Sequence, residues 1–175
     1  MKEEPRRLPE PMASVLASLP LVATPGMIVD ALVPACADLA WIAVLVGEHV
    51  RVRAYAHIDP MRLSALADFQ KYYAPGIDDT HSFMSRVIRT GMPEIVRPDA
   101  LAAVEQRVSN PGTRAALTAL GARTSLMVPL ADTTQATQSR GVLITAMSSS
   151  GRAVDEDDLQ LLVRFAQALS PRLHW

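Results

Sequence analysis

Apolar residues recur along the chain with two different periods, which predict a succession of helices and strands. The first apolar positions follow helical spacing and predict a short helix over residues 12–19. Thr24 and Pro25 form a typical helix start, because threonine can cap the first turn and proline is tolerated there. We therefore expect a second helix over residues 24–38, with a bend at Pro34.

The next segment has the two-residue period of a β-strand. A continuous apolar run over residues 41–46 leads to Gly47 and Glu48, which suit a hairpin turn. Residues 50–57 then alternate, with valine and alanine on one side and arginine, tyrosine and histidine on the other. This pattern is typical of a half-buried strand, so we expect the two segments to pair as a hairpin.

The rest of the chain predicts further helices and strands. A helix starts at Asp59-Pro60, and another over residues 81–90 ends at Gly91, which can adopt a left-handed cap. The remaining predicted elements are a strand over 93–96, helices over 99–108 and 113–120, strands over 125–130 and 141–147 joined by a polar link over 132–140, and a final helix over 155–169.

This order of elements does not alternate strictly between strand and helix, which favours an α+β fold over a doubly wound sheet. We predict a central antiparallel sheet of five to six strands. The terminal helices are expected to cover one face, and the middle helices and loops the other. Residues 1–11, with three prolines, are expected to form a flexible leader, and residues 12–172 a single domain.

Composition narrows the function classes. The chain of 175 residues has a net charge of -1 and lacks the basic patch that is typical of a nucleic-acid binder. Its most apolar stretch, residues 27–46, is interrupted by Asp30, Pro34 and Asp38, so we do not expect a membrane span. The charged opening is not followed by the apolar region of a signal peptide. We therefore expect a cytoplasmic protein that contacts neither nucleic acid nor membrane.

Five segments, taken in order, resemble bacterial GAF domains. Residues 120–130, LGARTSLMVPL, resemble the central strand of these domains, which often reads LGxRSxLxVPL. Other segments resemble the start of the next strand (141–143), the acidic opening of the last helix (155–159), the end of the second strand (56–60) and the step from helix to strand (87–94). The resemblance implies a small α+β signalling domain over most of the chain.

The chain departs from the GAF pattern in three places. Val154 stands where the family usually has phenylalanine, and the link over residues 132–140 lacks the usual tight glycine turn. No Asn-Lys pair follows the last strand, so the signature of the cyclic-nucleotide-binding branch is incomplete. The resemblance therefore does not predict cyclic GMP or cyclic AMP as the ligand.

The resemblance implies a ligand site between the sheet and the middle helices, and tyrosine and methionine suit such a site. Strand alternation predicts that Tyr55, His57, Ser125, Met127, Thr145 and Met147 face the middle helices, opposite Val52, Leu126, Val128, Val142 and Ile144. The candidate ligand-binding residues are Tyr55, His57, Phe69, Tyr73, His81, Phe83, Met84, Ser125, Met127, Thr145 and Met147. An ordinary apolar core is the alternative for the tyrosines, phenylalanines and methionines of this set.

The sequence holds no constellation that predicts an enzyme. Ser125 lies in a strand without the glycines of a nucleophile elbow, and no phosphate-binding loop is present. The only cysteine, Cys36, cannot form an internal disulfide or a multi-cysteine metal site. The enzymatic branch of the GAF family reduces free methionine sulfoxide with several cysteines. A chain with one cysteine is therefore not expected to be such an enzyme.

The sequence does not identify a cofactor. Some GAF sensors hold haem through a histidine, but for His57 and His81 we favour a ligand contact or helix capping over haem. Bilin-binding relatives attach their pigment through a cysteine near the middle of the domain, which this chain lacks. The ligand is therefore expected to be a small molecule of unknown identity, without a metal.

Two functions of different classes fit these observations. The first is a sensory module that binds a small molecule and signals through its terminal helices. The second is a ligand-free GAF domain that serves dimerisation or partner docking. In the final helix Leu161 and Ala168 lie outside the apolar stripe that one packed face requires, next to Val163, so we expect a homodimer through the terminal helices. The alternative is that Leu161 and Val163 cover the edge of the same core.

Overall fold

The computed structural model describes residues 10–132, 135–148 and 150–175. Their strands form one antiparallel sheet of five strands in the order β2-β1-β5-β4-β3. This confirms the predicted α+β fold. The strands are β1 (Leu39–Val46), β2 (His49–His57), β3 (Glu94–Val96), β4 (Thr124–Asp132) and β5 (Gln135–Met147).

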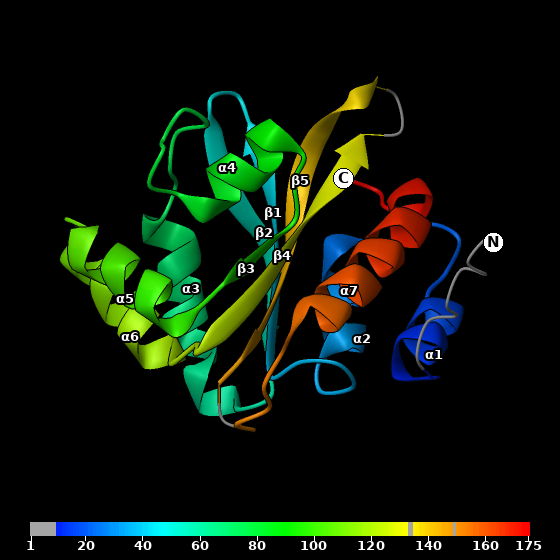
Figure 1. Ribbon diagram of the computed structural model, residues 1–175, viewed down its shortest axis with the longest axis horizontal. Coiled ribbons are helices and arrows are strands. Elements are labelled where there is room, and N and C mark those ends of the chain that lie inside the picture. Colours follow the sequence, from blue (N-terminus) through cyan, green and yellow to red (C-terminus); the bar gives the residue numbers. More distant parts are fainter. Residues whose placement is uncertain (1–9, 133–134, 149) are drawn as a thin grey trace.

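Helices cover both faces of this sheet, as predicted (Figure 1). The terminal helices α1 (Glu10–Ser18), α2 (Pro25–Leu32) and α7 (Glu156–Leu169) lie on one face. The middle helices α3 (Leu63–Tyr72), α4 (Phe83–Thr90), α5 (Pro98–Arg107) and α6 (Pro111–Leu120) lie on the other. Short 3-10 turns, Pro60–Arg62 and Ser170–Arg172, precede α3 and follow α7.

Each face of the sheet buries a core of its own. Leu143 and Phe165 belong to the core under the terminal helices, which we call the terminal-helix core. Trp41, Phe69 and Ile144 belong to the core under the middle helices, the middle-helix core. The central strands therefore have no solvent-facing side, because both of their faces are packed.

A β-bulge in β2 changes which side chains face the middle helices. The register between β1 and β2 shifts between Ile42 and Ala43, so that Arg53 is the extra residue of the bulge. One extra residue reverses the alternation of side chains along the strand. Val52 therefore packs into the middle-helix core and Ala56 into the terminal-helix core, whereas uniform alternation placed them on the same face.

The predicted face assignment of β5 is wrong by one residue. Thr145 lies opposite Leu126 of β4, and Met147 packs into the terminal-helix core. Val142 and Ile144 pack under the middle helices instead. The error has a physical cause: a shift of one residue exchanges the faces of a strand, and a strand buried on both sides lacks the regular alternation of apolar and polar residues that would mark one face.

Some boundaries also differ from the sequence prediction. Helix α2 ends at Leu32 rather than at residue 38, because Val33 precedes Pro34 and adopts an extended conformation (φ -103°, ψ 126°), as residues before proline prefer. The expected polar link belongs largely to the hairpin of β4 and β5. Helix α1 begins at Glu10, inside the predicted leader, and residues 1–9 lie outside the described part of the chain.

The helix ends follow their local chemistry. Asp155 caps α7, and Asp158 completes a reciprocal capping box with it. Gly91 ends α4 with φ +66°, in the left-handed cap that the sequence predicted. Within the residues that the structure describes, no helix is both long and apolar enough to cross a membrane.

Candidate functional site

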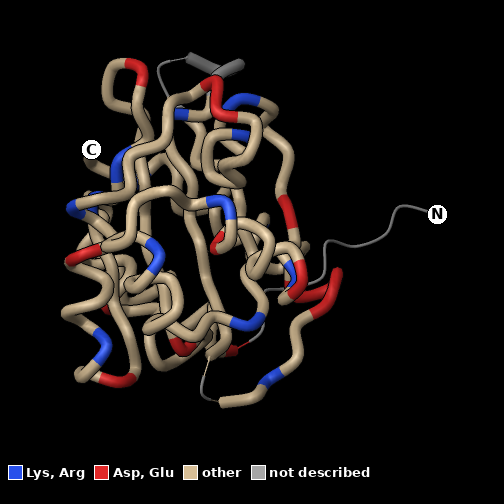
Figure 2. The backbone as a smooth tube through the Cα atoms, turned by 90° about the vertical axis from the view of Figure 1, so that its left-hand side faces the viewer, with Lys and Arg blue, Asp and Glu red and all other residues tan. Residues whose placement is uncertain are grey.

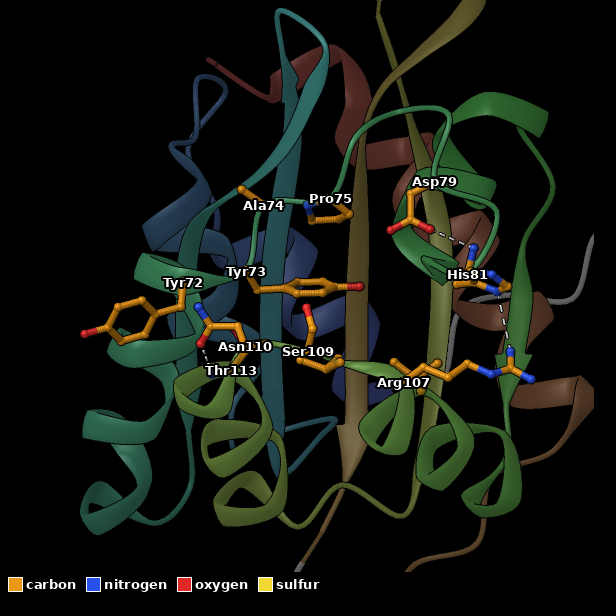
Figure 3. A pocket seen from close by; sticks show the side chains of 12 residues that line it. Tyr72, Tyr73, Ala74, Pro75, Asp79, His81, Arg107, Ser109, Asn110 and Thr113 are labelled. Atoms are coloured by element: carbon orange, nitrogen blue, oxygen red, sulfur yellow. Dashed lines mark hydrogen bonds between the residues drawn. The ribbon is translucent and has the colours of Figure 1, made fainter.

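A pocket of about 290 Å³ opens on the middle-helix side of the molecule (Figure 3). We call it the outer pocket. Pro75 and Asp79 line one side of it, and Ser109 and Asn110 line the other. The side chain of Tyr73 lies between the two sides. The loop after α3 and the connection between α5 and α6 therefore form the mouth of this pocket.

Polar contacts link the two sides of the mouth. The backbone N–H of His81 donates a hydrogen bond to Asp79 Oδ1 at 2.9 Å. Across the mouth, Arg107 Nη1 lies 3.5 Å from His81 Nδ1, and because arginine can only donate, the ring nitrogen accepts. A carboxylate, an imidazole and a guanidinium thus stand at the rim of the outer pocket, where a polar part of a ligand can meet them.

A smaller cavity of about 60 Å³ lies deeper, against the sheet. We call it the inner cavity. Tyr73 and Val104 line both spaces, so the inner cavity adjoins the outer pocket. The residues that line the inner cavity are Trp41, Phe69, Tyr73, Phe83, Met84, Leu101, Val104, Leu117, Leu120, Ala122, Ser125 and Met127.

Aromatic rings form one wall of the inner cavity. Phe69 stacks on Tyr73 with ring centroids 4.7 Å apart, and Trp41 meets Phe69 edge to face at 6.0 Å. Burial raises the pKa of the Tyr73 phenol, while a hydrogen bond with Ser82 acts in the opposite direction. Tyr73 therefore remains a neutral phenol, and the aromatic wall is uncharged.

Two polar atoms of the inner cavity's lining residues stay unpaired. Trp41 Nε1 and Ser125 Oγ are buried, and neither has a hydrogen-bond partner within the described part of the chain. Thr113 Oγ1, from the lining of the outer pocket, is also buried and has no hydrogen-bond partner in the described part of the chain. Native proteins satisfy nearly all buried polar groups, and each exception calls for an explanation. Small-molecule sites usually have an apolar lining that contains a few polar groups.

The structure brings together most of the residues proposed from the sequence. Phe69, Tyr73, Phe83, Met84, Ser125 and Met127 line the inner cavity, and His81 lines the outer pocket. Tyr55 packs at the edge of the middle-helix core and lines neither space. Thr145 and Met147 lie on the opposite face of the sheet, so their expected orientation toward the middle helices is corrected.

His57 is buried and has a local hydrogen bond. Its Nδ1 accepts from the backbone N–H of Asp59 at 2.8 Å, which places the ring proton on Nε2. Burial lowers the pKa of His57, and the positive charge of Arg62 lowers it further, against the smaller opposing effects of Asp59 and Asp38. The neutral ring therefore holds the turn that leads into α3. In the described residues, no cluster of three or more His, Cys, Asp or Glu side chains has the arrangement of a metal site.

Sequence reasoning missed part of both linings. It did not select Trp41, Ala122 or the leucines and valine that α5 and α6 contribute to the inner cavity, nor the polar rim residues Asp79 and Arg107. A signal for the helical residues was present: Leu101 and Val104, like Leu117 and Leu120, are three residues apart within a predicted helix. This spacing marks a buried face but does not tell which cavity that face meets.

Cys36 lies far from this site in the fold. It is buried in the terminal-helix core, on the other face of the sheet from both pockets. Burial raises the pKa of its thiol, and the charge of Arg152 opposes this effect only in part. A buried thiol with a raised pKa is poor in thiolate, the reactive form of cysteine.

The fold has counterparts among solved structures, although no family model and no curated protein matches the sequence. The GAF domain of a phosphoenolpyruvate-protein phosphotransferase from Coxiella burnetii superposes with a TM-score of 0.63 at 13% identity, over 93% of this chain and 90% of that one. The corresponding GAF domain from Acinetobacter gives a TM-score of 0.58 at 14% identity, over 91% and 86%.

An enzyme also shares this architecture. The free methionine-R-sulfoxide reductase of Neisseria meningitidis, solved in complex with its substrate, gives a TM-score of 0.58 at 15% identity, over 94% of this chain and 84% of that one. The fold of this protein is therefore that of GAF domains. At these identities the likeness concerns the fold alone, and the function has to be argued from the site.

Proposed function

We propose that this protein is a sensory module that binds a small molecule in the inner cavity and outer pocket and signals through its terminal helices. The observation that carries the proposal is the pair of buried, unpaired polar atoms, Trp41 Nε1 and Ser125 Oγ, of residues that line an otherwise apolar cavity. An unpaired buried donor costs about 1–3 kcal/mol, and a ligand that accepts from it would recover this cost.

The sheet offers a route from the pocket to the terminal helices. Trp41 and Met127 line the inner cavity, whereas their chain neighbours Ile42 and Val128 pack into the terminal-helix core. A ligand that displaces the first pair would move the second pair with them, because successive residues share one backbone. Packed cores respond to such displacements by shifts of whole helices, and α7 is the helix that contacts β4 most.

We propose a binding role rather than catalysis. Cys36 is the only cysteine of the chain, and it lies across the sheet from the pocket. A thiol-disulfide cycle within the chain needs a second cysteine. The charges also support a small-molecule ligand over nucleic acid, because acidic and basic residues are interspersed along the chain (Figure 2). We propose the cytoplasm as the place of action, where an unpaired thiol stays reduced.

Native mass spectrometry tests the proposal on full-length protein purified under mild conditions from its source. We expect a co-purified small molecule, whose mass identifies it. Ala122→Phe fills the inner cavity and should abolish the adduct, whereas Ala131→Phe adds the same ring at an exposed position of β4 and should retain it. Wild-type protein without any adduct, or an adduct that survives Ala122→Phe in folded protein, would contradict ligand binding at this site.

A second candidate function, self-association, is favoured by one surface feature. Leu21 and Val22, between α1 and α2, are 81% and 65% exposed, and Met27 of α2 is 47% exposed. Leu161 and Val163 of α7 are only partly exposed, and Val163 packs against the terminal-helix core. We therefore propose a homodimer on the terminal-helix side that forms through the connection between α1 and α2. A second copy of the same surface could cover these three residues.

A further inference from the structure

We infer that the ligand inserts a neutral carbonyl group into the inner cavity, where Trp41 Nε1 donates a hydrogen bond to the carbonyl oxygen. The inference rests on the proposed function, because it names the part of the ligand that this cavity takes. Three properties of the cavity carry it: its charge, its hydrogen-bonding groups and its size.

The lining of the inner cavity carries no charged side chain, so the inserted group is neutral. The residues lining the inner cavity are aromatic, aliphatic or thioether side chains, apart from the hydroxyls of Ser125 and Tyr73. Burial raises the pKa of Tyr73, so it supplies no negative charge. A carboxylate, phosphate or ammonium group in this space would lose its hydration without gaining a partner of opposite charge, which is strongly unfavourable.

The hydrogen-bonding groups decide that the inserted group is an acceptor. Trp41 and Ser125 lie on the same face of the sheet, on the two strands that flank β5. An indole N–H can only donate, and a serine hydroxyl can rotate to donate or to accept. A hydrocarbon would leave Trp41 Nε1 unsatisfied, and a hydroxyl would need Ser125 Oγ as the acceptor for its own proton, whereas a carbonyl oxygen can accept from both groups. A carbonyl oxygen has two lone pairs and no proton, so it suits a donor-only partner.

The size of the cavity decides how much of the ligand enters it. About 60 Å³ is less than half the roughly 150 Å³ of an apolar cavity that admits benzene. Only a head group therefore enters without displacement of the walls, and the rest of the molecule extends past Tyr73 and Val104 into the outer pocket. Asp79 and Arg107 stand there, so the far end can be polar or charged. The ligand class is an elongated molecule with a small ketone, ester or amide head and a more polar tail.

Two probes of nearly the same shape test the inference. Acetophenone carries a C=O group where α-methylstyrene carries C=CH₂. The chain has two tryptophans, so ¹⁵N-labelled protein has two indole N–H signals, and Trp175→Phe identifies that of Trp41. We expect acetophenone to move the Trp41 Nε1–H signal downfield and to bind about five- to tenfold more tightly than α-methylstyrene in chemical-shift titrations, as one net hydrogen bond allows.

Single substitutions locate the effect. Trp41→Phe and Ser125→Ala should each reduce the preference for acetophenone over α-methylstyrene. In Trp41→Phe the two probes should bind with nearly equal affinity. Ser85→Ala is the matched control, since Ser85 Oγ is also buried and unpaired among the described residues, but Ser85 does not line the inner cavity. It should leave the preference unchanged. If Trp41→Phe does not fold, the indole signal of the wild-type protein still decides the question.

Each negative outcome has a distinct meaning. Equal binding of the two probes, or binding of acetophenone without a shift of the Trp41 indole signal, overturns the inference but leaves the proposed function standing. Failure of both probes to bind at millimolar concentration also overturns it, because the inner cavity then takes no such head group. The proposed function fails separately, if native mass spectrometry of the wild-type protein finds no bound molecule.

Discussion

Asp38 and Ser148 are joined by a hydrogen bond between segments that are far apart in the sequence. Asp38 Oδ2 accepts from the backbone N–H of Ser148 at 2.9 Å and from that of Ser150 at 2.8 Å. Asp38 precedes β1 and is only 4% exposed, and Ser148 follows β5. The carboxylate therefore fixes the start of the connection to α7 against the first strand of the sheet.

Removal of this carboxylate should destabilise the fold. We expect Asp38→Ala to lower the free energy of unfolding by about 2–4 kcal/mol, because two backbone donors lose a charged acceptor in a buried place. Asp38→Asn should cost about half as much, since its amide oxygen can still accept. Urea unfolding followed by circular dichroism measures the effect. Asp30→Ala, at an exposed position of α2, is the control and should change stability by no more than about 0.5 kcal/mol.

His57 should make stability depend on pH. Burial and the charge of Arg62 lower the pKa of His57 in the folded protein below its ordinary value of 6.5. Below pH 6.5 His57 therefore binds more protons in the unfolded chain than in the folded one. The stabilising contribution of the neutral ring is complete above about pH 6.5 and is lost as the pH falls through the lower folded value. Protonation would also remove the acceptor that Nδ1 offers to Asp59.

Urea unfolding at a series of pH values tests this expectation. Between pH 7.5 and pH 5 the wild-type protein should lose more unfolding free energy than His57→Asn, whose side-chain oxygen can still accept. His49→Asn, at an exposed histidine, should follow the wild-type curve. Parallel curves for the wild-type protein and His57→Asn would show that His57 does not carry this dependence.

Two glycines with the same backbone conformation should respond differently to a methyl group. Gly47 has φ +60° and open space at its Cβ position, whereas a Cβ at Gly121, with φ +59°, would lie 2.6 Å from Arg62 Nη1. Arg62 Nη1 donates to the carbonyl of Leu120 at 2.7 Å. Gly47→Ala should cost about 1 kcal/mol for its left-handed backbone. Gly121→Ala should cost about 1 kcal/mol more, because it displaces that hydrogen bond.

A double-mutant cycle separates the two contributions to the cost at Gly121. In an Arg62→Ala background, Gly121→Ala should cost no more than Gly47→Ala in the same background. Thermal and urea unfolding provide the numbers. An undiminished difference between the two glycines in that background would mean that Arg62 is not its cause.

The exposed apolar residues between α1 and α2 should control any self-association. We expect sedimentation at micromolar concentration to detect a dimer, and Leu21→Glu with Val22→Glu to shift it to the monomer, because charges would enter the apolar contact. Leu161→Glu, on the partly buried surface of α7, should weaken the dimer less. A wild-type monomer, or a dimer that the double variant leaves unchanged, would rule out this interface.

The sequence by itself determined the features that depend on neighbouring residues. Thr24 caps α2, Asp155 caps α7, and Gly91 ends α4, because in each case the capping group and the backbone it serves lie within four residues of each other. The order of helices and strands follows equally from local periodicity. From that order the antiparallel α+β architecture could be predicted, with its terminal and middle helices on opposite faces.

Only the tertiary structure decided which side chains meet. Both faces of β5 are buried, so its apolar pattern reads the same in either register, and Thr145 could be assigned to the middle helices although it faces the terminal ones. The reversal at Arg53 depends on pairing with β1. The inner cavity arises where Trp41, Ser125 and the apolar faces of α5 and α6 converge without filling the space. Such a gap is a property of packed volumes, and no periodicity along one segment encodes it.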